Sequence, residues 1–151
     1  MLAEVIRERG SLTQETLKLM SDLMQDGRRF TWIRDIARQI VAGSRTTAEE
    51  SRRVWEWTRQ NLRYLEDPPG MEWVQSLEAS LQIKAGDCDD MAVAAGTLLY
   101  SLGHHVVPVA VWWQDRPRFT HAVMLDKTSG LIVDPVSPVF APWPPQGRKI
   151  H

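Results

Sequence analysis

The feature that most constrains the fold is a change of periodicity at Gly103. Before this glycine, apolar residues within 88–102 recur with the 3.6-residue period of a helix. After it, the run Val106–Trp113 is rich in β-branched and aromatic residues, which is typical of a strand. Two further stretches, residues 120–126 and 131–134, have the same character and flank a short turn. This order predicts a helix packed against a meander of antiparallel strands.

Three stretches in the N-terminal third also have helical spacing. The first has Ser11 or Thr13 as its cap and ends at Gly27, the second ends at Gly43, and the third begins near Thr46 or Thr47. We therefore expect three helices before any strand, and the fold class is predicted as α+β. The apolar stripes are Leu17, Met20, Leu23 and Met24, then Ile33, Ile36, Ala37, Ile40 and Val41, and then Val54, Trp57 and Leu62.

Length and composition favour one ordinary globular domain. With 151 residues the chain has room for one core in a single domain over residues 1–151, with a proline-rich tail from 135 to 151. The 18 basic and 19 acidic side chains give a net charge of −1, without the basic excess that nucleic-acid binding needs. The apolar runs are far shorter than the roughly 20 residues that span a bilayer. A lone cysteine forms no internal disulfide, so we expect a cytoplasmic protein.

That cysteine, Cys88, lies at the predicted start of the central helix, between Gly86-Asp87 and Asp89-Asp90. A helix N-terminus carries about half a positive charge and unpaired amides, which lower the pKa of a thiol and can hold an oxyanion. Cys88 is therefore a candidate nucleophile. The ordinary alternative is a small buried side chain with no chemical role.

His121 and Asp134 lie on neighbouring predicted strands. A register with Leu125 opposite Gly130 would place Asp134 directly across from His121, and a shift of two residues would leave them diagonal neighbours on one face. The carboxylate could then orient the imidazole. A purely structural histidine–aspartate pair is the alternative.

Cys88, His121 and Asp134 together supply a nucleophile, a base and an orienting carboxylate, as thiol acyl transfer requires. The sequences Gly86-Asp87-Cys88-Asp89-Asp90-Met91-Ala92, Thr120-His121-Ala122-Val123 and Val133-Asp134-Pro135 resemble the transglutaminase-like superfamily of papain-like cysteine enzymes. The segments 61–68 and 73–77 resemble its small phage and prophage members. The similarity runs over about residues 31–135, which it implies is the core of the domain. The chain differs at Leu77, where the family commonly has proline, and at residues 131–133, where it commonly has an aromatic residue.

The resemblance implies cysteine-dependent amide acyl transfer by a peptidase, amidase or transglutaminase-like enzyme, without a cofactor. The substrate would be a protein or peptide, and phage structural proteins are candidate partners, with a virion-associated location if the gene belongs to a phage. A non-catalytic phage-particle assembly or binding module that retains the fold is the alternative, and a glutamine deamidase is a third possibility.

Further candidates surround this set. Gln75 or the indole of Trp73 could complete an oxyanion hole with the Cys88 amide, although core packing for Trp73 and a solvated amide for Gln75 are the simpler interpretations. One of Trp112 and Trp113 should face outward and could line a substrate groove.

Other polar residues have simpler interpretations. Helix capping explains the acids Asp87, Asp89 and Asp90 without an ion, so no metal is expected. The remaining polar candidates are interpreted as solvated residues; they are the turn residues His104 and His105, the terminal His151, and the helix-face pairs Arg28-Arg29 and Arg52-Arg53.

Overall fold

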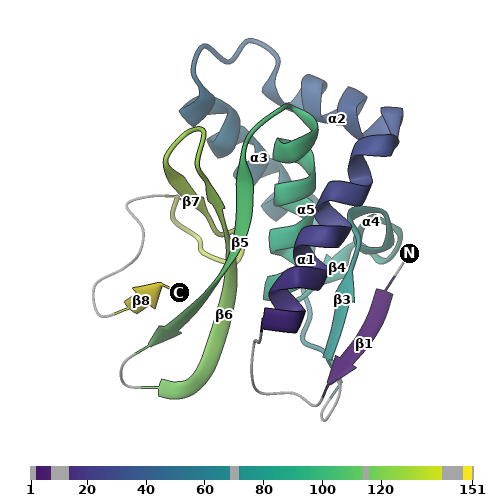
Figure 1. Ribbon diagram of the computed structural model, residues 1–151. Coiled ribbons are helices and arrows are strands. Elements are labelled where there is room, and N and C mark those ends of the chain that lie inside the picture. The colour runs from purple at the N-terminus through teal and green to yellow at the C-terminus, as the bar shows by residue number, and fades with distance from the viewer. Residues whose placement is uncertain (1–2, 8–13, 69–71, 114–115, 141–147, 151) are drawn as a thin grey trace.

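One buried helix, α5 (Cys88–Ser101), forms the centre of the protein (Figure 1). The computed structural model describes residues 3–7, 14–68, 72–113, 116–140 and 148–150, with side chains within 14–68, 73–111 and 121–140. Residues 89–99 are all buried, because small and apolar side chains cover every face of the helix. Three helices pack around it, and these are α1 (Gln14–Asp26), α2 (Thr31–Val41) and α3 (Thr47–Asn61), with the short 3₁₀ turn η1 (Gly27–Arg29) after α1.

A four-stranded antiparallel sheet lies on the other side of α5, in the order β7-β6-β5-β8. Alternation divides its residues between two faces. Ala110, Ala122, Met124 and Val133 join the helical core, whereas a second apolar cluster is centred on Val111 and its neighbours. The strands are β5 (Val106–Trp113), β6 (Arg116–Asp126), β7 (Leu131–Val133) and β8 (Arg148–Ile150).

Two small sheets flank the start of α5. β1 (Ala3–Arg7) pairs antiparallel with β3 (Glu72–Gln75), and β2 (Arg63–Tyr64) pairs parallel with β4 (Ala85–Gly86). Between β3 and β4 lies the helix α4 (Leu77–Ile83), which Ser76 caps by accepting from the amide of Ala79. The expectation that three helices precede any strand is wrong, because β1 comes first. Its partner lies about 70 residues away in the sequence, so no local pattern indicates the pairing.

Two glycines allow the helices and the sheet to approach closely. A Cβ at Gly27 would lie 2.4 Å from Cγ2 of Thr97 on α5. A Cβ at Gly96, in the middle of α5, would lie 2.9 Å from Cε of Met124 on β6 and 3.0 Å from Sδ of Met24 on α1. Hydrogen at these positions lets α5 contact both neighbours.

The expected α+β class is confirmed by this arrangement. Of the two candidate caps, Thr46 caps α3, since its side chain accepts from the amide of Glu49. Ser11 and Thr13 lie outside the described residues. A single domain over residues 1–151 stays a prediction. Within the described ranges, no helix has both the length and the apolar character needed to cross a bilayer.

Candidate active site

The start of α5 is held by a reciprocal cap. The carboxylate of Asp87 accepts from the amide of Asp90, and the carboxyl group of Asp90 accepts from the amide of Asp87 at 3.1 Å. Gly86 is needed beside this pair, because a Cβ there would lie 2.6 Å from Cβ of Asp90. The acids of this segment therefore cap the helix, as the sequence indicates, and they fix Cys88 in its first turn.

Cys88 is half-buried where the start of α5 meets β6. Burial raises the pKa of its thiol well above the ordinary value, and the charges of Asp89 and Asp87 raise it further. A hydrogen bond from the backbone amide of Ala122 acts in the opposite direction. Burial and the flanking carboxylates therefore act against the acidification of the thiol that is expected at a helix N-terminus.

His121 and Asp134 are in direct contact. Nε2 of His121 lies 2.8 Å from Oδ2 of Asp134, and both side chains are buried. The last pair of the β6–β7 ladder is Met124 with Val133, which differs by two residues from the register that would set His121 opposite Asp134. The diagonal arrangement is thus the one found, and the direct one is wrong.

The turn that carries Asp134 is fastened to α3. The indole Nε1 of Trp55 donates to the backbone oxygen of Asp134 at 2.9 Å. The guanidinium of Arg59 donates to the carbonyls of Pro135, Val136 and Ser137, between 2.8 and 3.2 Å. Because both donors sit on one helix, α3 sets where the Asp134 carboxylate lies. Nothing in the sequence indicates this support, since Trp55 and Arg59 have the pattern of ordinary helix residues.

The two side-chain oxyanion candidates have different surroundings. Nε2 of Gln75 lies 3.2 Å from both the backbone oxygen of Ala85 and Oδ2 of Asp90, so the protein already uses its hydrogens. The structure does not support Gln75 as an oxyanion donor. The alternative interpretation of its side chain as a solvated surface amide is also wrong, because the amide bonds within the protein. Trp73 is half-buried and lines a cavity of about 200 Å³ together with Gln75, Gly86 and Asp90.

Three carboxyl groups beside this cavity are close enough to hold a metal ion. One oxygen from each of Asp67, Asp87 and Asp90 lies within 4.8 Å of the others. Hydrogen bonds explain these acids without an ion, since Asp67 accepts from the amide of Trp73 at 2.7 Å. Burial and the charge of Asp87 raise the pKa of Asp90 to about 9, which favours the neutral form of this carboxyl group.

The expected groove residues Trp112 and Trp113 lie on β5, but their side chains fall outside the described residues, as does His151. Arg28 and Arg29 are exposed, as expected, although Arg28 also lines a cavity at the C-terminal end of α5.

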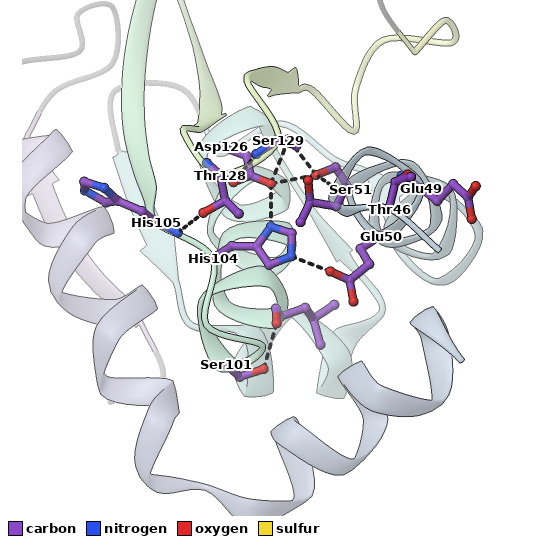
Figure 2. A network of polar contacts seen from close by, with 12 residues as sticks. Thr46, Glu49, Glu50, Ser51, Ser101, His104, His105, Asp126, Thr128 and Ser129 are labelled. Atoms are coloured by element: carbon purple, nitrogen blue, oxygen red, sulfur yellow. Dashed lines mark hydrogen bonds and ion pairs between the residues drawn. The ribbon is translucent and has the colours of Figure 1, made fainter. Parts of the chain in front are cut away.

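His104 corrects the expectation of a solvated turn. His105 is exposed, but His104 is buried, with Nδ1 2.7 Å from Oδ2 of Asp126 and Nε2 2.8 Å from Oε1 of Glu50 (Figure 2). Ser51 donates to the same Asp126 oxygen at 2.6 Å. The network joins α3, the end of α5 and the β6–β7 turn. It lies at the opposite end of α5 from Cys88.

The fold and this site define an α+β protein with a cysteine at the start of a central helix and a histidine–aspartate pair on the adjoining sheet. The family model of the transglutaminase-like superfamily matches residues 34–125, more than half of the chain. The chain belongs to that superfamily, which confirms the resemblance seen in its motifs.

Two solved structures share the fold at low sequence identity. A proposed cysteine protease from Cytophaga hutchinsonii is 15% identical with a TM-score of 0.57, and the match covers 91% of this chain and 50% of that one. A proposed protease from Parabacteroides distasonis is 9% identical with a TM-score of 0.57, covering 91% of this chain and 36% of that one. The chain thus spans half the length of the first and about a third of the second. No curated protein matches the sequence.

Proposed function

We propose that the protein is a cysteine-dependent acyl transferase that acts on amide bonds of a peptide or protein. Cys88 is the nucleophile, His121 the general base and acid, and Asp134 the group that orients His121. The observation that carries the proposal is the 2.8 Å contact between Nε2 of His121 and Oδ2 of Asp134, one residue from the Ala122 amide that bonds the Cys88 sulfur.

The contact assigns a role to each ring nitrogen. When Nε2–H of His121 donates to Asp134, the neutral ring carries its basic lone pair on Nδ1. In this mechanism Nδ1 takes the proton of the Cys88 thiol as the sulfur attacks the amide carbonyl. The same proton then passes to the leaving amine, the C–N bond breaks, and a thioester remains on Cys88. Because burial and carboxylates raise the pKa of the thiol, proton removal accompanies attack instead of preceding it.

The developing oxyanion would be held by the backbone amide of Cys88, which as the first residue of α5 has no acceptor within the helix. The cavity lined by Trp73 adjoins Gly86 and Asp90, so it is a candidate binding site for a side chain of the substrate. Trp73 then acts as a groove residue or as a second donor to the oxyanion.

The acceptor that resolves the thioester decides the reaction. Water gives hydrolysis of a peptide bond or deamidation of glutamine, whereas a lysine amine gives an isopeptide crosslink. The resemblance to small phage members makes phage structural proteins candidate partners, either in the cytoplasm or in the virion.

The experiment incubates the protein with casein, with glutamine-containing peptides and a biotinylated amine, and with peptidoglycan-derived peptides. Intact-mass spectrometry then distinguishes cleavage, the gain of about 1 Da on deamidation, and amine incorporation. We expect Cys88→Ala to abolish the mass change while altering the free energy of unfolding by no more than about 2 kcal/mol, because the lost group is small.

The matched control is Thr97→Ala, which also shortens a side chain of α5 but lies far along the helix from Cys88. It should leave the reaction unchanged once folding is verified by circular dichroism. If no substrate changes mass and wild type and Cys88→Ala bind a phage structural protein equally, the assembly module replaces the enzyme.

A further inference from the structure

Three arginines gather around a cavity that the proposed chemistry does not use. The cavity has a volume of about 440 Å³ and lies at the end of α5 distant from Cys88. Its lining comprises Arg28, Arg34, Arg38, Tyr100, Ser101, Leu102, Gly103 and His104.

The charge of this lining is one-sided. Arg34 and Arg38 are exposed one helical turn apart on α2, and neither has an ion-pair or hydrogen-bond partner among the described residues. No carboxylate is among the residues that line the cavity. The whole chain has a net charge of −1, so a general excess of basic residues does not account for the cluster.

The third arginine, Arg28, is held in place by the side chain of Tyr100. Nη1 of Arg28 lies 3.3 Å from the hydroxyl of Tyr100, and its guanidinium carbon is 5.4 Å from the centre of the Tyr100 ring. A guanidinium held on an aromatic face retains several N–H donors for a ligand. The Tyr100 hydroxyl accepts from Arg28, which leaves its own hydrogen available to donate.

The surrounding negative groups do not cancel this charge. The C-terminal end of α5 contributes about half a negative charge, which one cation would balance and three exceed. The two nitrogens of His104 already contact Asp126 and Glu50, so this ring offers no further donor to a ligand. Asp26 is paired with Arg29 at 3.1 Å.

From this geometry we propose that the cavity between α2 and the end of α5 binds a small, multiply charged oxyanion of the phosphate-ester class. Arg34 and Arg38 bind its oxygens in pairs, as guanidinium groups do with phosphate, while Arg28 contacts it from η1 and the Tyr100 hydroxyl contacts it from α5. A bound anion removes the mutual repulsion of the three guanidinium groups. The site is separate from Cys88, since α5 is about 20 Å long.

The experiment is calorimetric titration of the full chain with inorganic phosphate, pyrophosphate and citrate at constant ionic strength and pH 7. We expect saturable binding of pyrophosphate with one site, weaker binding of phosphate, and at least tenfold weaker pyrophosphate binding in the Arg34→Gln/Arg38→Gln double variant. Citrate distinguishes phosphoryl from carboxylate recognition, and equal binding of citrate would overturn the phosphate class.

The matched control is Arg45→Gln, which removes the same charge from an exposed arginine between α2 and α3 that does not line the cavity. Its pyrophosphate affinity should change by less than twofold. Because Arg34 and Arg38 are exposed and unpaired, their removal should leave the melting temperature in chloride buffer unchanged. Equal weakening in the double variant and in the control variant, or no saturable binding by the wild type, would overturn the site.

Discussion

At Cys88 the carboxylates of the helix cap act against the helix end. We expect the rate of alkylation by iodoacetamide to rise with pH through a pKa above the ordinary thiol value of about 8.5. Asp87→Asn should move that pKa down, because it removes a negative charge near the sulfur while asparagine caps a helix as well as aspartate does. Since Cys88 is the sole cysteine, intact-mass spectrometry measures its alkylation directly.

Asp35→Asn, on an exposed part of α2, is the control for charge alone and should leave the profile in place. A wild-type profile below the ordinary thiol range would restore the expectation of a helix-stabilised thiolate. An unchanged profile in Asp87→Asn would show that the capping carboxylate does not influence the thiol.

Asp134 provides the second prediction at this scale. Asp134→Asn keeps the shape of the side chain but replaces a carboxylate acceptor by an amide, so the tautomer of His121 is no longer fixed. If the proposed function is correct, kcat should fall by at least about 100-fold. Steady-state kinetics on the peptide identified by mass spectrometry measures the fall. A variant with unchanged kcat and KM would leave the pair with a structural role only.

At the scale of elements, the His104 network fastens three segments together. His104→Ala should lower the free energy of unfolding by about 3 kcal/mol, because the carboxylates of Asp126 and Glu50 lose their buried partner. His105→Ala, at the exposed neighbouring position, should stay within about 0.5 kcal/mol of the wild type. Urea denaturation monitored by tryptophan fluorescence measures both, and equal effects would contradict the difference in burial.

The same network gives the stability a pH dependence. Burial alone would lower the pKa of His104, but hydrogen bonds to Asp126 and Glu50 outweigh it and raise the pKa above 6.5. Burial alone would raise the pKa of Asp126, but hydrogen bonds from His104 and Ser51 outweigh it and lower the pKa below 3.8. The His104 contribution is fully present below pH 6.5 and is lost as the pH rises through the raised value.

The Asp126 contribution is present above pH 3.8 and is lost as the pH falls through the lowered value. The stability difference between wild type and His104→Ala should therefore be largest between pH 3.8 and 6.5 and shrink above that range. Repeating the urea denaturation from pH 4 to 9 measures this difference. A difference that grows with pH would contradict the assigned directions.

Elements with local signals were predicted from the sequence, and elements with distant partners were not. α5 and β5 were predicted because the periodicity of each lies within one short stretch of sequence. Gly103 follows the end of α5 as predicted, and its φ of 93° is a backbone conformation that favours glycine. β1 depends on a partner beyond α3, which no window contains. The β6–β7 register differs by two residues from the one that would set His121 opposite Asp134. The sequence therefore identified the two strands without determining how they pair.

The candidate site divides in the same way. Cys88, His121 and Asp134 were predicted because their residue types and order carry chemical meaning. Trp55 and Arg59 were not, because they act through backbone carbonyls that have no sequence signature. His104 was misassigned because a histidine after a helix-ending glycine gives no indication of its burial or of its carboxylate partners.

At the scale of the whole molecule, the fold should be independent of metal. Asp67, Asp87 and Asp90 are close enough to bind an ion, but burial raises the pKa of Asp90 to about 9, and Asp87 caps α5. We expect EDTA, and separately millimolar Ca²⁺, to leave the melting temperature unchanged in differential scanning calorimetry. A shift with either reagent, absent in Asp67→Asn, would show that these acids bind an ion.

The spacing between α5 and the sheet depends on the hydrogen of Gly96. A methyl group there would require the ends of Met24 and Met124 to move by a few tenths of an ångström, or β6 to shift together with His121. Relatives that carry alanine at this position should therefore carry smaller side chains at one of the two methionine positions. Such correlated substitutions in α5, α1 and β6 would show that the family tolerates little change in the distance between the thiol of Cys88 and the imidazole of His121.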